Sequence, residues 1–475
     1  MYEIIHQQWV DFDGRLLIVG FGSIGQGVLP LLLRHLRIAP EQISIVTAGE
    51  DGSAIAERHG VGFADRAITR TNYREVLESR LGAGDFLLNL SIDVGSLDLI
   101  AWCQERDVLY LDACIEPWAG GYTDPSISPA MRSNYAMREG AQALRQSDRP
   151  RATAVVTHGV NPGLVSHFLK QALLNLAADL RPEVAEPVSR QEWAALARRL
   201  GVRAIHIAER DTQTSLRKKR PGEFVNTWSV NGFVGEGCQP AELGWGTHEH
   251  HWPLGAHRHG FGCDSAIWLE RPGASVRVRS WTPLEGAYQG FLITHGESIS
   301  IADYLTVREG DQVVYRPTVH YAYHPCDDAV LSMHELAGKG WQLQPVQRIL
   351  GESAIDSGMD ELGVLLLGHA RGAYWFGSRL TIEQARACCP YNNATTLQTC
   401  AGVLSGVVWA MRHPQAGIVD PEEMDFRENM EVAFPYLGEM VGVYGEWTPL
   451  DGRNLLFPED VDTEDPWQFH NILVK

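Results

Sequence analysis

The segment at residues 15–25 reads Arg-Leu-Leu-Ile-Val-Gly-Phe-Gly-Ser-Ile-Gly. Leu16 to Val19 are consecutive apolar residues, as a strand buried on both faces requires. Gly20, Gly22 and Gly25 follow at G-x-G-x-x-G spacing, and apolar residues at helical spacing come after them. Such glycines permit a sharp turn, a close approach of backbone to phosphate and close helix–strand packing. The segment therefore predicts a dinucleotide site at a helix N-terminus. The alternative is a purely structural turn.

The length of the chain indicates how many domains it has, and its charge indicates which ligands it disfavours. A chain of 475 residues is too long for one core, so two or three domains are expected. Its 59 acidic residues outnumber 40 Lys plus Arg, for a net charge of −19. This excess disfavours nucleic acid and anionic membranes and attracts cationic ligands, although an ordinary acidic surface also accounts for it.

The cysteines and the apolar segments indicate the compartment. Eight cysteines occur without a C-x-x-C pair, which is typical of a reduced, cytoplasmic protein. The N-terminus has no basic region followed by an apolar core, so no signal peptide is expected. No apolar run approaches the roughly 20 residues of a membrane span. We therefore expect a cytoplasmic protein without a membrane partner.

Strand and helix patterns alternate up to about residue 165. Strands are expected at 43–46, 86–90, 108–112 and 152–156, and helices at 53–59, 72–81, 97–105 and 130–145. Such alternation predicts an α/β fold with a doubly wound parallel (Rossmann-like) sheet. Residues 1–165 would form this dinucleotide-binding domain.

The residues at the end of the second predicted strand help to distinguish NAD from NADP. An acid there favours NAD, and an arginine favours NADP. No arginine follows Val46 directly, and Glu50 and Asp51 come slightly late, so NAD is the expected cofactor. The residues that we assign to the cofactor are Gly20, Gly22, Ser23, Ile24, Gly25, Thr47, Ser91 and Asn161.

Polar residues follow three of the predicted strands. Asp93, Glu116 and Asn161 come after the strands that end near residues 90, 112 and 156. Ligands of such sheets bind outside the carboxyl ends of the strands, so these side chains are expected to meet at a substrate site. Each of them alone could also be an ordinary loop or helix-capping residue.

The middle of the chain changes character from about residue 200. Strands are expected at 203–208, at 275–279, at 290–294, at 313–315 and in a hairpin of 363–367 with 374–377, with a helix at 328–336. Residues 224–234 are expected to form two short strands around an Asn231-Gly232 turn. We interpret 166–390 as an inserted α+β substrate and dimerisation domain. A small-residue helix at 395–411 would return the chain to the first domain, which about 390–420 would complete, and 420–475 would be a surface segment.

Two features of the inserted domain have competing interpretations. His248, His250, His251, His257 and His259 resemble metal ligands, but their spacing fits no zinc template, so no metal is expected. Trp228 is either a core residue of a strand or, beside Glu209 and Glu236, a cation–π site for an amine.

Several longer motifs give the chain a specific resemblance. The glycine loop is followed by Asn89-Leu-Ser-Ile-Asp93, Leu111-Asp-Ala-Cys-Ile-Glu116-Pro-Trp and His158-Gly-Val-Asn161-Pro-Gly. Asn226-Thr-Trp228-Ser-Val and Met359-Asp360-Glu-Leu-Gly-Val come later. Over nearly its whole length the chain resembles bacterial homospermidine synthases, which are similar in fold to saccharopine dehydrogenases.

The resemblance implies a transferase that keeps NAD as a prosthetic group. It implies that putrescine is oxidised to an imine, that ammonia leaves as a second putrescine condenses, and that the new imine is reduced to sym-homospermidine. The expected partners are therefore putrescine and related diamines, and a homodimer is expected.

The resemblance also suggests roles for particular residues. The catalytic residues would be Glu209 as proton acceptor, Asn161 in positioning, Trp228 in stabilising an iminium by about 1–2 kcal/mol, and His295 as a proton shuttle, unless it is structural. The substrate-binding residues would be Asp93, Glu116, Glu236 and Asp360. The alternatives are a saccharopine- or carboxyspermidine-type reductase using external NADPH and a non-catalytic NAD-binding sensor. The sequence shows no arginine cluster that would bind a substrate carboxylate, and this argues against the reductase.

Overall fold

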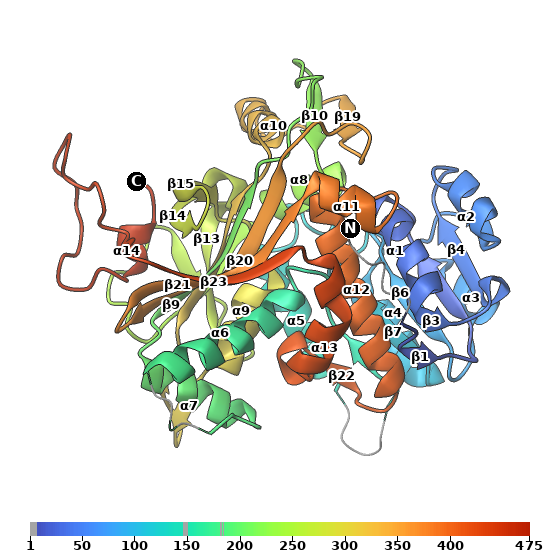
Figure 1. Ribbon diagram of the computed structural model, residues 1–475, viewed down its shortest axis with the longest axis horizontal. Helices are drawn as coiled ribbons and strands as arrows, with labels where there is room; N and C mark the ends of the chain where they lie inside the picture. The colour runs from blue at the N-terminus through green and yellow to red at the C-terminus, as the bar shows by residue number, and fades with distance from the viewer. Residues whose placement is uncertain (1–6, 146–150, 181–182, 184) are drawn as a thin grey trace.

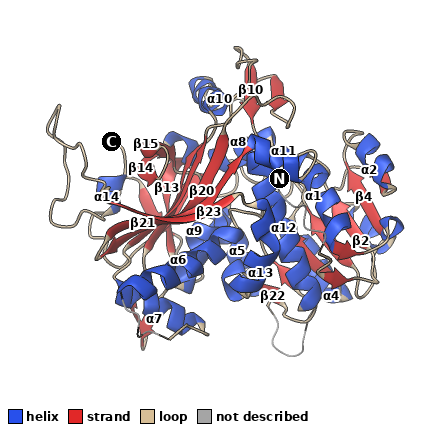
Figure 2. Ribbon diagram, in the orientation of Figure 1, coloured by secondary structure: helices blue, strands red, loops and turns tan. Residues whose placement is uncertain are grey.

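The computed structural model describes residues 7–145, 151–180, 183 and 185–475. Residues 1–6, on which the expectation about a signal peptide mainly depends, lie outside the described residues. The chain builds two large sheets, a parallel one and a mixed one, which lie at the right and the left of Figure 1. Helices pack on both (Figure 2).

The parallel sheet contains the glycine segment. Among the described residues it has seven strands, in the spatial order β22 (Ile418–Val419), β8 (Ala154–Val155), β7 (Leu109–Asp112), β6 (Phe86–Asn89), β2 (Leu16–Val19), β4 (Ile43–Thr47) and β5 (Gly62–Asp65). The chain order reverses at β2, which pairs with β4 on one side and β6 on the other. This topology confirms the predicted doubly wound sheet and places a ligand crevice beyond the carboxyl ends of β2 and β6.

Alternate residues of β2 face two different cores. Leu16 and Ile18 belong to a core that also contains residues of α1 (Ser23–His35) and α12 (Ala394–Arg412). Leu17 and Val19 belong to the opposite core, with residues of α3 (Tyr73–Glu78) and α4 (Ser96–Arg106). Both faces of the sheet are therefore covered, as the continuous apolar strand predicts.

The mixed sheet comes mainly from the middle of the chain. Its described strands, in spatial order, are β12 (Ala256–Arg258), β13 (Ala266–Pro272), β11 (Pro240–Gly244), β18 (Thr318–His324), β9 (Ala204–Asp211), β20 (Met359–His369), β21 (Gly372–Thr381) and β23 (Glu439–Gly445). The hairpin of β14 (Arg277–Thr282) and β15 (Gly286–Phe291) joins it at β18. Helices α6 (Leu164–Leu180) and α9 (Gly296–Tyr304) pack on one face, and α14 (Phe469–Ile472) contributes to the core on the other.

The remaining elements are peripheral to the two sheets. The helices are α2 (Ser53–His59), α5 (Asn134–Ala143), α7 (Arg190–Leu200), α8 (Val230–Cys238), α10 (Asp327–Gly338), α11 (Ile382–Cys388) and α13 (Phe426–Ala433). Three short strand pairs are β1 (Val10–Asp11) with β3 (Leu36–Arg37), β10 (Glu223–Asn226) with β19 (Val346–Ile349), and β16 (Val307–Glu309) with β17 (Gln312–Tyr315).

The prediction of an Asn231-Gly232 hairpin is wrong. Only β10 is a strand there, and α8 begins at Val230 because the Ser229 hydroxyl accepts the Gly232 N–H at 3.1 Å and caps the helix. Tertiary packing explains the helix despite its glycines: a Cβ on Gly237 would lie only 3.2 Å from Met333 and Ala274. Close packing at these positions outweighs the low helix propensity of glycine.

The prediction that 420–475 is a surface segment is wrong for its first part. Helix α13 packs against α12 and α6 and buries Phe426 and Val432, and β23 pairs with β21 in the mixed sheet. Buried apolar side chains hold this part in the fold. Residues 449–467, by contrast, contain the exposed Leu455, Leu456 and Phe457.

Helix α12 is the one helix among the described residues that is long and apolar enough to cross a membrane. It lies inside the protein, where 94% of its most apolar window is buried. Its length and composition are therefore explained by packing between α1, α13 and β7.

Candidate active site

The glycine loop lines a groove at the end of β2. Gly20 has φ +85°, and a Cβ there would lie 2.6 Å from the Ser91 nitrogen, so only glycine fits. A Cβ on Gly25 would lie 2.9 Å from the Gly20 oxygen, which keeps helix and strand close. Apart from the adjoining chain, none of the described residues places an atom within 4 Å of a Cβ on Gly22. Open space at a helix N-terminus fits a dinucleotide pyrophosphate.

The predicted cofactor residues divide between this groove and a second space. Gly20, Gly22, Ser23, Ile24, Thr47 and Ser91 line the groove. The Thr47 hydroxyl also accepts the Phe21 N–H at 3.3 Å. Gly25 is buried behind the loop, and Asn161 lines the adjoining cavity instead of the groove.

Arg66 lines the same groove near Thr47 and Ala48. It follows β5, whereas the sequence rule for NADP concerns an arginine directly after β4. Its guanidinium is 3.1 Å from the Glu75 carboxylate. The arginine is therefore already paired with an anion of the protein.

A cavity continues from the groove toward the mixed sheet. Ile24, Ser91 and Ser229 line both spaces, so the two are adjacent. The described residues that line the cavity include three glutamates and no lysine or arginine: Glu116, Glu209 and Glu236. The other polar side chains of the lining include His295, Trp228, Tyr321 and Asn161. Such a space suits a cation that is long enough to meet carboxylates at different points.

Glu209 lies on β9 and is 2% exposed. Its Oε2 accepts hydrogen bonds from the Asn161 amide at 3.0 Å and from the Tyr321 hydroxyl. Burial raises the pKa of Glu209 to about 8, and the nearby Asp211 adds to the effect of burial. A carboxyl with this pKa can take up and release a proton near neutral pH.

Trp228 lies between β10 and α8, not in a strand as expected. Its Nε1 donates to the Tyr323 hydroxyl at 3.1 Å, and its ring centroid lies 5.4 Å from that of Phe233. A Cβ on Gly232 would be 3.1 Å from the ring, so the glycine leaves space for it. The indole is half-buried and lines the cavity together with Glu209.

His295 precedes α9 and bridges two carboxylates. Its Nε2 is 3.1 Å from Glu236 and its Nδ1 is 3.2 Å from Glu297. Burial by itself lowers the pKa of His295, but the two carboxylates outweigh it and raise the pKa to about 10. The side chain is therefore an imidazolium at neutral pH. The prediction of a proton shuttle, which used the ordinary pKa of histidine, does not fit this environment.

Glu116 and Asp93 follow β7 and β6. Glu116 is 4% exposed, and burial, with Glu236 nearby, raises its pKa well above the usual range. Asp93 is exposed and lines the groove, not the cavity, and partial desolvation raises its pKa. Of the three residues predicted to meet at the strand ends, Glu116 and Asn161 share the cavity and Asp93 lies outside it.

Asp360 is placed behind the cavity wall. It is fully buried on β20 opposite Asp211, and it is not among the lining residues. Burial raises its pKa well above the usual range, and Thr395, which does line the cavity, is its neighbour. Direct contact of Asp360 with a substrate therefore does not fit this arrangement.

Sequence reasoning missed Tyr321 and Tyr323. Both lie on the same face of β18, and their rings stack at 5.1 Å with 14° between the planes. The Tyr321 hydroxyl donates a hydrogen bond to Glu209, and the Tyr323 hydroxyl accepts one from the Trp228 N–H. Side chains of a strand alternate between its two faces, so a strand predicted at 318–324 would have placed both tyrosines on one face.

The histidines at 248–259 lie outside both spaces. His259, for example, is 3.1 Å from the buried Glu242. These side chains are therefore separate from the candidate active site.

Comparison with known proteins gives matches over nearly the whole chain. Residues 16–155 match the saccharopine dehydrogenase NADP binding domain, and residues 159–445 match the saccharopine dehydrogenase C-terminal domain. The chain is 54% identical to homospermidine synthase of Blastochloris viridis over 467 residues, which are 98% of each chain. It is 49% identical to that of Mesorhizobium japonicum over 472 residues, 98% of this chain and 97% of the relative.

A solved structure is also similar. It is homospermidine synthase of Legionella pneumophila in complex with NAD, which is 49% identical and superimposes with a TM-score of 0.91. The match covers 98% of both chains.

Proposed function

The chain belongs to the homospermidine synthase family, and we propose that it uses NAD to join two putrescine molecules into sym-homospermidine with release of ammonia. The observation that carries the proposal is the cavity lined by Glu116, Glu209 and Glu236 without lysine or arginine among the described lining residues. Burial raises the pKa of Glu116 and of Glu209, and an ammonium group of a diamine beside either carboxyl offsets that effect of burial. An amino acid substrate would instead bring a further carboxylate to this wall.

The proposed reaction conserves atoms and electrons. The first putrescine loses a hydride from the carbon next to one nitrogen and a proton from that nitrogen, which leaves an imine. The amine of a second putrescine adds to this carbon, ammonia leaves, and the new imine takes a hydride and a proton. When bound, NAD supplies the acceptor and then the donor of that hydride.

Glu209 is the proposed proton acceptor. Only an uncharged amine has the lone pair that assists hydride loss, so the ammonium must first give up a proton. The buried carboxyl has a pKa of about 8, and the Asn161 amide, 3.0 Å from Oε2, orients it. Asn161 and the Tyr321 hydroxyl thus hold the base toward the reacting nitrogen.

Trp228 is the proposed stabiliser of the iminium. The reacting carbon and nitrogen become a cation when the hydride leaves, and an indole face attracts a cation by about 1–2 kcal/mol in a desolvated site. The Tyr323 hydroxyl fixes the ring through Nε1 at 3.1 Å. The ring also excludes water, which would hydrolyse an imine.

Glu116 and Glu236 are the proposed partners of the remote ammonium. Glu236 forms an ion pair with His295, so its negative charge is already balanced in part before the substrate binds. Glu116 has no such cation, and the ammonium would supply it. Asp93, at the mouth, would attract the incoming amine.

A homodimer in the cytoplasm is part of the same proposal. Light scattering coupled to size-exclusion chromatography tests the assembly, and the expected mass is twice that of the chain. A monomeric mass would overturn this part without affecting the reaction.

The direct test is incubation of the purified protein with putrescine and NAD. Homospermidine, measured by mass spectrometry, and ammonia should appear in equal amounts, and no NADH should accumulate. Steady NADH formation with an aldehyde product would indicate a diamine dehydrogenase instead. A requirement for external NADPH and an amino acid would indicate a reductase of the saccharopine type, and binding of NAD without turnover would indicate a sensor.

A further inference from the structure

Two segments far apart in the sequence meet outside the candidate active site. They are the loop at 246–255 and the C-terminal segment at 446–471. The fully buried Gln468 joins them, because its amide donates to the His248 oxygen at 2.7 Å and accepts the His250 N–H at 3.0 Å. The Phe469 N–H also donates to the Glu249 carboxylate at 2.9 Å. The backbone on both sides of the contact is therefore held in place.

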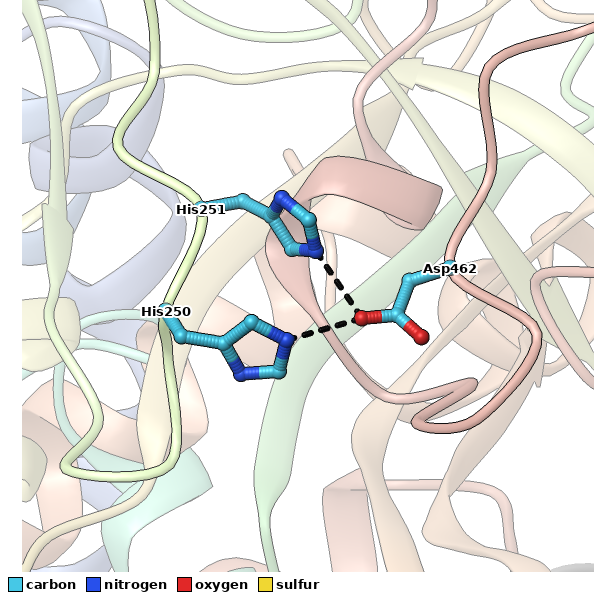
Figure 3. A group of neighbouring side chains, drawn as sticks. All are labelled: His250, His251 and Asp462. Atoms are coloured by element: carbon cyan, nitrogen blue, oxygen red, sulfur yellow. Dashed lines mark hydrogen bonds and ion pairs between the residues drawn. The ribbon is translucent and has the colours of Figure 1, made fainter.

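Three side chains with metal-binding atoms converge where the segments meet. His250 Nε2 and His251 Nε2 lie 2.8 and 2.9 Å from Oδ2 of Asp462, and all three atoms lie within 4.8 Å of one another (Figure 3). Figure 3 shows both rings directed at the same carboxylate from one loop, with Asp462 on the opposite segment. None of the three lines the groove or the cavity.

Neighbouring groups orient these ligand atoms. His250 Nδ1 lies 3.3 Å from the His248 oxygen, so the ring can donate there and leave Nε2 free for a metal. Oδ1 of Asp462 accepts the N–H groups of Glu464 and Asp465 at 2.9 and 3.0 Å, which leaves Oδ2 facing the histidines.

The backbone of Asp462 is fixed as well. The fully buried Asn471 accepts the Asp462 N–H and donates to the Asp462 oxygen, each at 2.8 Å. An imidazole that donates through its other nitrogen, and a carboxylate that is itself hydrogen-bonded, are the outer contacts found around metal ligands.

We propose that His250, His251 and Asp462 form a binding site for a divalent transition metal such as Zn²⁺, which fastens the C-terminal segment to the 246–255 loop. Two imidazoles and one carboxylate are ligands that this ion prefers, with water in a fourth position. Tetrahedral zinc bonds of about 2.0–2.1 Å separate ligand atoms by about 3.4 Å. The present separations to Oδ2 are about half an ångström shorter, and the two rings, 58% and 36% exposed, can move apart by that amount.

The competing interpretation is an ion pair between the histidines and Asp462. Both arrangements hold the segments together, but only a metal site responds to added metal. His257 provides a matched control, because it is an exposed histidine of the same region, 2.9 Å from the Glu270 carboxylate, without a second imidazole in the pair.

The test uses the full chain without an affinity tag, after dialysis against a chelator. Calorimetric titration with ZnCl₂ should give one bound ion per chain for the wild type and for His257→Asn, together with a higher melting temperature. The double variant His250→Asn, His251→Asn should bind at least about tenfold more weakly. Equal binding by the double variant, or no binding by the wild type at micromolar free zinc, would overturn the proposal.

A second measurement locates the ion. Hydrogen exchange at the Glu464 and Asp465 amides should slow when zinc is added to the wild type and stay unchanged in the double variant. Zinc binding without this protection would contradict the assignment. The proposal does not depend on turnover, because neither readout involves putrescine or NAD.

Discussion

At Glu209, burial and two hydrogen-bond donors set the protonation of a single carboxyl group. Because its pKa is raised to about 8, the group is mostly protonated at pH 6 and mostly ionised at pH 9. A base must be ionised, so kcat/KM for putrescine should rise with pH through about 8. Glu209→Gln should lower kcat by about 10²–10⁴-fold and remove this pH dependence. Initial rates of ammonia release at a series of pH values measure both effects.

The stability of the same variant provides the control. A carboxyl whose pKa is higher in the folded than in the unfolded state stabilises the fold at low pH, and this stabilisation is lost as pH rises from about 4.5 through about 8. The wild type should therefore lose on the order of a few kcal/mol over this range relative to Glu209→Gln. Denaturant unfolding at several pH values measures the difference. Equal pH profiles, in rate and stability, would show that Glu209 is not the titrating group.

The indole of Trp228 lines the cavity with one polar contact, to Tyr323. Trp228→Phe should slow kcat by about tenfold, because the phenyl face attracts a cation less strongly. Trp228→Ala should nearly abolish turnover and cost less than the 3–5 kcal/mol of a fully buried cavity, because the ring is half-buried. Turnover and melting temperature are measured together, and activity that only follows the loss of folded protein would contradict the cation–π role.

A double variant tests whether Tyr323 acts through the ring of Trp228. Tyr323→Phe removes the acceptor of the Trp228 N–H and should slow the wild type. In the Trp228→Phe background it should have no further effect, because that ring has no N–H. An equal effect in both backgrounds would mean that Tyr323 acts independently of Trp228.

Three side chains that the sequence analysis assigned to one site lie together in the structure, and their roles stay predictions. Glu209, Glu236 and Trp228 were named because carboxylates and an indole suit a diamine, and the cavity brings them together. The pKa of His295 could not be predicted, because it depends on two carboxylates that only the fold brings beside the ring.

At the scale of elements, the turn from β2 into the first residues of α1 gives its glycines different roles. A side chain at Gly22 enters open space in the groove, whereas one at Gly25 meets the Gly20 oxygen at 2.9 Å. Gly22→Val should therefore block NAD binding with unfolding free energy changed by about 0.5 kcal/mol or less. Gly25→Val should cost about 1–3 kcal/mol through overpacking. Nucleotide released on heat denaturation and the unfolding midpoint without nucleotide measure the two effects. Stoichiometric NAD in Gly22→Val would contradict the placement of the pyrophosphate.

The elements that sequence predicts well are those with a strong local pattern. Helix α2 spans Ser53–His59, as predicted, and β2 follows its apolar run. Helix α8 was missed because Asn231-Gly232 is typical of a hairpin, and its helix depends on contacts with Met333 and Ala274 from elsewhere in the chain. Local patterns do not contain such contacts.

At the scale of the whole molecule, the site forms where two sheets meet. The loops after β7 and β8 bring Glu116 and Asn161, and β9 brings Glu209 from the mixed sheet. The topology rule for parallel sheets predicted the first two. No local rule predicts which face of a second sheet will lie opposite, so the catalytic role of Glu209 was assigned only with the family resemblance.

The net charge of the molecule should affect how fast a diamine reaches this site. A charge of −19 attracts a dication over long distance, and salt screens the attraction with a Debye length of about 10 Å at 0.1 M. Raising NaCl should therefore lower kcat/KM for putrescine several-fold and leave kcat nearly unchanged, because the buried contacts of the bound diamine are screened much less. Steady-state kinetics at several salt concentrations measure this. Butylamine, which carries one charge and lacks the second amine, serves as the control: it should compete with putrescine, and its inhibition constant should change less with salt than the KM of putrescine. A kcat/KM that does not depend on salt would mean that diffusion in the field of the protein does not limit capture.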